Sequence, residues 1–214
     1  MSVPCINLID LIETPPNYFI NIGVGVGKDG TVSKEAQYVK NKFPDINIYG
    51  IEADKERYEL IKKDFPGSLH YGAVGNTDKP VTMYKDPCGS GIDMVIGSKI
   101  NDKVISQPAT PGIMLDKFCN EHNIGKEFTD KIFLWADCEG HELEILKGAH
   151  NLLKKHLISY IILELWVCSP YPETPWIEAK SVIEYLNLHG YIMTSKSYGN
   201  KYDALFQPII VSCI

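Results

Sequence analysis

Four ionisable side chains follow directly after an apolar run near the middle of the chain. Asp137, Glu139, His141 and Glu142 fall within six residues. Carboxylates and an imidazole at the end of a strand can act as general acids or bases. Helix capping is the competing interpretation, and it is favoured for Glu142 because acids stabilise the first turn of a helix. For Asp137 we favour the functional interpretation.

Two chemistries are open to this cluster. His141 could act as a general base, since the ordinary pKa of histidine lies near physiological pH, or it could be an exposed residue in the first turn of a helix. Asp137 and Glu164 could instead bind a magnesium ion together with water, although Glu164 could equally be a buried acid held by hydrogen bonds. We predict a site without a metal and keep the divalent cation as the alternative.

A glycine-rich segment follows an earlier apolar run. Gly23 and Gly25 would let the backbone turn sharply and approach a ligand. Glu52 ends the next predicted strand, where a carboxylate can bind the ribose hydroxyls of NAD or of S-adenosylmethionine, or can simply precede a helix. From Gly25 the sequence also matches the dinucleotide fingerprint G-x-G-x-x-G. That fingerprint needs its first glycine at the strand end, which is here Gly23, so NAD remains only an alternative.

Short apolar runs alternate with helical patterns, which predicts a parallel sheet covered by helices. The predicted strands are Tyr18–Ile22, Ile46–Glu52, Leu69–Val74, Val81–Tyr84, Ile132–Ala136, Tyr160–Leu165, Tyr191–Ser195 and Ala204–Pro208. The predicted helices are Ser33–Lys42, Asp54–Asp64, Leu115–His122, His141–Lys155 and Trp176–His189. The last two strands read as a hairpin around Tyr198-Gly199-Asn200.

No repeat or long linker divides the chain, so we expect one domain over residues 1–214 with an N-terminal extension at 1–16. Residues 86–112 are rich in Gly, Pro, Ser and Asp and are predicted to form a lid or substrate loop. Neither a signal peptide nor a membrane span is indicated, which predicts a cytoplasmic protein. The six cysteines are scattered without a C-x-x-C pair, which indicates neither a zinc site nor a disulfide framework.

The net charge of −6 disfavours nucleic acid as a partner, because phosphate contacts dominate that affinity. Arg57 is the only arginine, which leaves few bidentate phosphate contacts. Three aromatic residues follow the strand that contains Glu164 and could contact the faces of a sugar, or could pack within the loop: Trp166, Tyr171 and Trp176.

The segment from Asp137 to Ala149 resembles the hallmark of the FkbM methyltransferases, D-V-E-G-x-E followed by L-x-G. Four further segments are similar to family patterns. Ile22-Gly23 through Val26-Gly27 is similar to D-V-G-A-N-V-G, and Glu52-Ala53 is similar to F-E-P. Ala73-Val74-Gly75-Asn76 is similar to the turn A-V/L-G/S-N/D, and Leu115-Asp116-Lys117-Phe118 is similar to L-D-x-F/L. Gly190-Tyr191 and Asp203–Phe206 also fit, so the resemblance runs from about residue 17 to residue 208.

This resemblance implies a Rossmann-like class I methyltransferase fold: a mostly parallel seven-stranded sheet with helices on both faces and an antiparallel C-terminal strand. It implies S-adenosylmethionine as cofactor and a hydroxyl of a saccharide or another small metabolite as methyl acceptor. The implied cofactor-binding residues are Asn21, Gly23, Gly25, Glu52, Ala53, Ala73, Val74 and Asp137, and the predicted catalytic residues are Asp137, Glu139 and His141. Three positions depart from the pattern: Asn21 replaces the usual aspartate, Gly25 an asparagine and Ala53 a proline. Besides the NAD oxidoreductase, a non-catalytic protein that binds S-adenosylmethionine stays open as an alternative.

Overall fold

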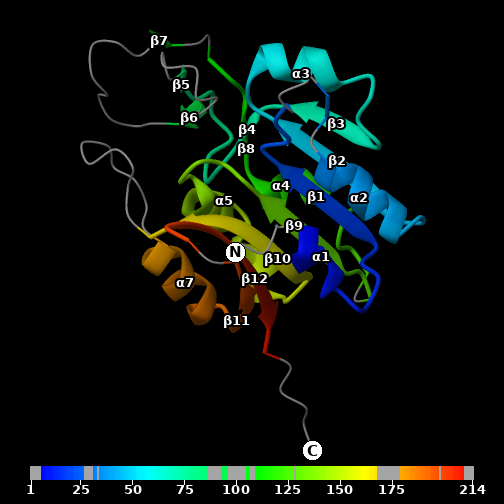
Figure 1. Ribbon diagram of the computed structural model, residues 1–214. Helices are drawn as coiled ribbons and strands as arrows, with labels where there is room; N and C mark the ends of the chain where they lie inside the picture. Colours follow the sequence, from blue (N-terminus) through cyan, green and yellow to red (C-terminus); the bar gives the residue numbers. More distant parts are fainter. Residues whose placement is uncertain are drawn as a thin grey trace, which may run out of the picture.

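A sheet of seven strands forms the centre of the molecule (Figure 1). The computed structural model describes residues 6–26, 31–32, 34–85, 93–95, 105–106, 109–127, 129–167, 179–197 and 199–209. The strands lie in the order β11-β12-β10-β9-β1-β2-β3. Their bounds are β1 (Tyr18–Ile22), β2 (Asn47–Glu52), β3 (Ser68–Tyr71), β9 (Ile132–Ala136), β10 (Ile158–Trp166), β11 (Tyr191–Lys196) and β12 (Lys201–Pro208). β12 is antiparallel to both its neighbours and the other pairs are parallel, so the predicted fold is confirmed.

Helices cover both faces of this sheet. One face packs against α1 (Ile6–Asp10), α2 (Lys34–Lys42) and α3 (Lys55–Ile61). The other packs against α4 (Leu115–Glu121), α5 (Glu142–Gly148), α6 (His150–Lys154) and α7 (Ala179–Leu188). We call these the α2 face and the α5 face. Both are apolar because successive side chains of a strand point to opposite sides and both sides of this sheet are buried.

The described part of the predicted N-terminal extension belongs to the core. Leu8, Ile9 and Ile12 are fully buried against the α2 face. The ammonium of Lys42, on α2, donates a hydrogen bond to the carbonyl of Ile9 at 2.8 Å. The segment before β1 therefore closes one end of the α2 face.

The single strand predicted over Leu69–Val74 is wrong, because the chain leaves the sheet at Gly72. β3 ends at Tyr71, and β4 (Ala73–Val74) instead pairs in parallel with β8 (Gly112–Ile113). A Cβ on Gly72 would lie 2.4 Å from the end of the Ile113 side chain and 3.0 Å from the carbonyl oxygen of Pro111, so glycine allows the close approach of these two segments. The break carries Ala73 and Val74 away from the sheet edge.

The predicted helix His141–Lys155 is two helices, α5 and α6, separated at Ala149. The carboxylate of Asp116, on α4, accepts hydrogen bonds from the backbone amides of Asn151 at 2.8 Å and Leu152 at 3.0 Å. An acid in this position caps the start of α6 and satisfies amides that a continuous helix would have bonded internally. The L-D-x-F segment thus has a structural role.

Short strands lie within and directly before the region predicted as a lid. β5 (Met83–Lys85) pairs with β6 (Asp93–Val95) and with β7 (Ile105–Ser106) in an antiparallel sheet. Thr110 and Val81 form a further antiparallel bridge. Most of residues 86–112 lies outside the described ranges, so the lid stays a prediction.

Within the described ranges no helix has both the length and the apolar character needed to span a membrane. Cys119 is buried and Cys138 is half-buried, and both are free thiols. The other four cysteines lie outside the described residues.

Candidate active site

The site begins where the two central strands turn. Going outward from β1, the chain order of the strands reverses between β1 and β9, and open α/β sheets bind ligands at the carboxyl ends of the strands at such a point. Ile22 and Ala136 are paired in register, so Gly23 and Asp137 leave the sheet side by side. Gly23 has a φ of 73°, and a Cβ there would lie 2.2 Å from the carbonyl oxygen of Asp137. Only glycine fits this crossing.

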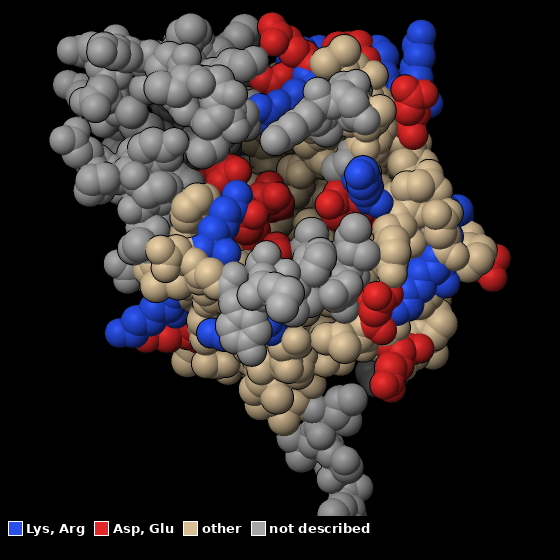
Figure 2. Space-filling view, viewed as in Figure 1, with Lys and Arg blue, Asp and Glu red and all other residues tan. Residues whose placement is uncertain are grey.

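A cavity of about 270 Å³ opens beyond these turns. Its wall contains all the predicted site residues except Asn21: Gly23, Gly25, Glu52, Ala53, Ala73, Val74, Asp137, Glu139 and His141. Figure 2 shows acidic side chains gathered in a hollow of this face, with basic side chains beside it. The structure therefore brings together residues that lie as much as 118 positions apart, from 23 to 141.

Glu52 is buried at the end of β2 and already holds two loops. Its Oε2 accepts a hydrogen bond from the amide of Gly25 at 2.9 Å, and its Oε1 accepts one from the amide of Asp54 at 2.8 Å. Burial raises the pKa of the Glu52 carboxyl, and these hydrogen bonds offset part of the rise. Because a carboxylate offers about four acceptor positions, Glu52 can still accept further hydrogen bonds from a ligand.

Asn21 does not line the cavity. It is 1% exposed on β1, two residues before Gly23, and its Nδ2 has no hydrogen-bond partner among the described residues. A buried amide without a hydrogen-bond partner lowers the free energy of unfolding, so Asn21 destabilises the end of β1 that precedes the glycine loop.

The turn after β9 is held by Glu142. Its Oε1 accepts hydrogen bonds from the amides of Cys138 at 3.0 Å and Gly140 at 3.4 Å. Burial raises the pKa of Glu142 to about 8. Glu139 and Gly140 have φ values of 50° and 94°, a left-handed conformation that is rare for glutamate and concentrated at functional sites. The spacing E-G-x-E therefore encodes a turn that presents Glu139, with Glu142 as its support.

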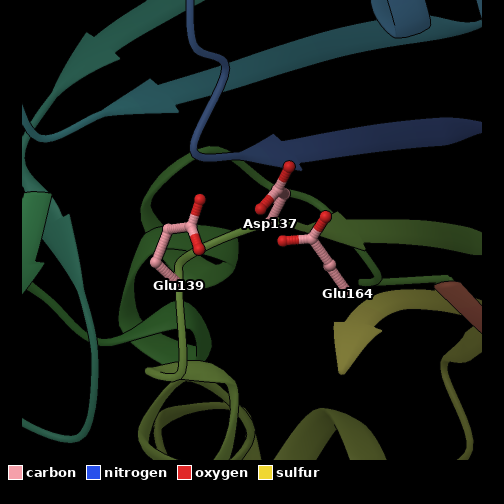
Figure 3. A group of neighbouring side chains, drawn as sticks. All are labelled: Asp137, Glu139 and Glu164. Carbon is pink, nitrogen blue, oxygen red and sulfur yellow. The ribbon is translucent and has the colours of Figure 1, made fainter. Parts of the chain in front are cut away.

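Three carboxylates face a common space beside this turn, and we call them the acidic centre. Asp137 and Glu139 come from the turn and Glu164 from β10 (Figure 3). One oxygen of each lies within 4.8 Å of the others, a grouping that could hold a cation. Oδ1 of Asp137 and Oε2 of Glu139 are buried and have no hydrogen-bond partner within the described ranges. Burial first, and then the charge of Glu164, raise the pKa of Asp137 well above its ordinary value.

Strand alternation explains why these acids meet. Trp135 and Ile162 belong to the apolar α2 face, so the period of two places Asp137 and Glu164 on the same side, just beyond the core. The polar residues thus extend the α2 face toward the carboxyl ends of the parallel strands.

Lys201 completes the acidic centre, and our sequence analysis missed it. Its Nζ lies 2.5 Å from Oε2 of Glu164 and 3.4 Å from Oε1 of Glu139. We predicted a strand from Ala204, whereas β12 begins at Lys201. Counting back in steps of two from Leu205, which packs on the α2 face, would have placed Lys201 there.

Trp166 is paired with Lys201 across the two strands, and the ammonium lies 4.9 Å from its ring centre. It is therefore the one described residue of the predicted aromatic group that adjoins the acidic centre. Tyr171 and Trp176 lie outside the described residues.

His141 lies on another wall of the cavity, next to the turn after β4. Its Nε2 is 3.0 Å from the position of a Cβ on Gly75. Burial lowers its pKa, so the imidazole is neutral at physiological pH and can accept a proton. Ala73 and Val74 line the same cavity, whereas Glu164 and Lys201 belong to β10 and β12 on the far side of β9.

The glycine loop does not have the geometry of the dinucleotide fingerprint. Val26 forms a β-bridge with Val32, and α2 begins only at Lys34. The third glycine of that fingerprint packs a helix that opens at once, whereas Gly30 precedes α2 and lies outside the described residues. We therefore do not retain the NAD alternative.

Several solved structures are similar to the chain at low sequence identity. They include a TehB-like SAM-dependent methyltransferase from Corynebacterium glutamicum (12% identity, 95% of this chain and 86% of that one, TM-score 0.45) and precorrin-6y C5,15-methyltransferase from Geobacter metallireducens (13%, 94% and 85%, TM-score 0.48). Magnesium protoporphyrin IX methyltransferase from Synechocystis is a third (8%, 94% and 78%, TM-score 0.43).

Sequence families give a more specific result. No curated protein matches the chain. The model of the Methyltransferase FkbM domain matches residues 21–193, from β1 to β11. This match covers the glycine loop, Glu52, the turn after β4 and the whole hallmark. The chain therefore belongs to the FkbM family of S-adenosylmethionine-dependent methyltransferases.

Proposed function

We propose that the protein transfers a methyl group from S-adenosylmethionine to a hydroxyl oxygen of a saccharide or another small hydroxylated metabolite. The observation that carries this proposal is a pair of buried carboxylate oxygens at the cavity, Asp137 Oδ1 and Glu139 Oε2, that have no hydrogen-bond partner among the described residues. An unpaired buried acceptor costs about 1–3 kcal/mol, and hydroxyl groups of a bound ligand would remove that cost.

The cavity wall fits the cofactor. Gly25 has a φ of 67° and lines the cavity, and among the described residues a Cβ there would meet only the carbonyl oxygen of Gly23, at 3.9 Å. Gly23 and Gly25 would border the amino-acid part of the cofactor, and the remaining acceptor positions of Glu52 would bind the ribose hydroxyls. Ala53, Ala73 and Val74 would border the adenine. When bound, S-adenosylmethionine supplies a methyl group without its bonding electrons, which stay on sulfur.

The acidic centre would prepare the acceptor. A hydroxyl must lose its proton as its oxygen lone pair forms the new C–O bond, so the site needs a base. Asp137 lies at the strand end between the cofactor loop and Glu164, and we assign it the proton. Glu139 would accept a second hydrogen bond from the acceptor and orient it.

His141 is the second candidate for the base, and the two candidates differ in their expected pH–rate profiles. The pKa of Asp137 is raised and that of His141 is lowered. If Asp137 is the base, the rate rises with pH through a value above that of an ordinary aspartate, and His141→Ala keeps this limb. If His141 is the base, the limb lies below 6.5 and disappears in His141→Ala.

The acceptor class is supported by charge. A net charge of −6, one arginine and three carboxylates around the reaction space oppose a phosphate-rich polymer and suit hydroxyl groups.

The test is to incubate the protein with methyl-labelled S-adenosylmethionine and separate panels of glycans, small alcohols, RNA and DNA. We expect label in the glycans or alcohols and none in a parallel reaction with Asp137→Asn. Label confined to nucleic acid would overturn the acceptor class. Binding of S-adenosylhomocysteine without transfer to any panel would instead support the non-catalytic alternative.

A further inference from the structure

The charge balance of the acidic centre depends on one residue. Lys201 contacts two of its three carboxylates, Glu164 at 2.5 Å and Glu139 at 3.4 Å. Three acids that close together repel one another strongly when the surroundings exclude water. A positive charge among them lowers this repulsion, and the chain supplies one from β12.

The same three acids form a grouping that suits a divalent cation. Oxygen ligands from carboxylates are what Mg²⁺, Ca²⁺ and Mn²⁺ prefer, and here one oxygen from each residue lies within 4.8 Å of the others. The ammonium of Lys201 lies among these carboxylates and is already paired with Glu164 and Glu139. A divalent ion could bind only if the ammonium moved away.

Lys201 is also held in place from a second side. Its Nζ lies 4.9 Å from the ring centre of Trp166, a distance at which a cation is attracted to an aromatic face. Trp166 and Lys201 are opposite each other in the antiparallel pairing of β10 and β12, so the backbone fixes their approach. The ammonium is therefore part of the built site and is not a passing surface contact.

We propose that Lys201 is the resident cation of the acidic centre: its ammonium takes the position of a divalent ion and holds Glu164 and Glu139 in place beside the acceptor. Lys201 is in this sense a positioning residue. Its effect on the acceptor rests on the proposed function, whereas its occupation of the cation position does not.

The experiment measures cation binding without cofactor or acceptor, so its outcome is independent of methyl transfer. The probes are Mn²⁺, followed by calorimetry, and Tb³⁺, whose luminescence increases when a tryptophan close to the bound ion is excited. Trp166 is suitably placed to sensitise an ion that replaces the ammonium. Four proteins are compared: the parent chain, Lys201→Met, Lys201→Arg and Lys117→Met. Lys117 pairs with Asp78 at 3.1 Å, away from the acidic centre, and is the matched control.

We expect the parent chain, Lys201→Arg and Lys117→Met to bind Mn²⁺ weakly or not at all. Lys201→Met should gain one site with a Kd of about 10⁻⁴ M, in the range of weak oxygen-ligand sites. Sensitised Tb³⁺ emission should appear in Lys201→Met and be lost on adding Trp166→Phe. Circular dichroism checks that each variant is folded, and Lys201→Gln replaces Lys201→Met if the latter is not.

Two results would overturn the proposal. One is binding of one Mn²⁺ by the parent chain with a Kd of about 10⁻⁴ M together with sensitised Tb³⁺ emission, which would mean that the ammonium does not compete for the position. The other is a folded Lys201→Met or Lys201→Gln that gains no site. The parent chain alone decides the first result, even if both variants fail to fold.

Discussion

Two pairs of acids in this cavity look alike in sequence and differ in their hydrogen bonds. Glu52 and Glu142 each accept hydrogen bonds from two backbone amides. Asp137 and Glu139 each keep a buried oxygen without a partner among the described residues. The first pair holds loops in place, and the second pair is left to bind something else. Counting hydrogen bonds thus separates supporting carboxylates from ligand-binding ones, which residue type alone cannot do.

The largest effect should come from the second pair. Asp137→Asn removes the proposed base, and we expect turnover to fall by about 10²–10⁴-fold, the usual contribution of general base catalysis. The free energy of unfolding should hold or rise, because the substitution removes a repulsive charge from the acidic centre. Turnover is measured with labelled cofactor on the identified acceptor, and thermal unfolding provides the control. If turnover in Asp137→Asn equals that of the parent, Asp137 is not the base and has a structural role like that of Glu52 and Glu142.

A smaller effect is expected where Glu52 holds the glycine loop. Gly25→Val places a branched side chain at a φ of 67° on the cavity side. Binding of S-adenosylhomocysteine should weaken by about 10–100-fold, which corresponds to roughly 1.4–2.8 kcal/mol. Calorimetry measures this, with Val24→Ala as the comparison because Val24 is buried in the core. Unchanged affinity for S-adenosylhomocysteine in Gly25→Val would show that the glycine loop does not contact the cofactor.

Removing a supporting carboxylate should act on stability. Glu142→Ala leaves the amides of Cys138 and Gly140 without their acceptor, and we expect a loss of about 1–3 kcal/mol in the free energy of unfolding. Urea unfolding measures it. A matched Glu144→Ala, on the exposed side of α5 where the acid pairs with Lys147, should cost less than about 1 kcal/mol. Equal losses in the two variants would contradict a supporting role for Glu142.

A pH dependence of stability tests the same supporting carboxylate. Burial raises the pKa of Glu142 from 4.5 to about 8, so the folded chain retains a proton that the unfolded chain releases between these values. Stability from this group is complete below about pH 4.5 and falls as the pH rises toward 8. The melting temperature of the parent should decline over this window more steeply than that of Glu142→Gln. Parallel curves would show that Glu142 does not contribute.

Much of the sheet and of the cavity wall was predictable because the evidence is local. β1 and β9 have the predicted bounds, since apolar runs flanked by glycine or by an acid mark buried strands. Glu139 and Gly140 were identified as part of the hallmark, but only the structure shows that they adopt left-handed conformations.

What sequence could not supply depends on contacts between distant segments. The break between α5 and α6 depends on Asp116, 35 residues before the amide of Asn151 that it binds. At Gly72, where the chain leaves the sheet, an added Cβ would meet Ile113, which lies 41 residues later in the sequence. Lys201 reaches Glu139 across 62 residues, and although the period of two could place Lys201 on the α2 face, it could not identify its partner. These misses share one cause, which is that each depends on a contact with another element.

The antiparallel direction of β12 determines how mutations in the neighbouring hairpin could change the charge of the site. Its first residue lies at the same edge of the sheet as the last residues of β10, so Trp166 faces Lys201. A slip of one residue in this pairing would turn the ammonium to the opposite face and bring the phenol of Tyr202 into its place. An insertion or deletion in the hairpin before β12 would therefore change the chemistry of the site without altering any residue that lines the cavity.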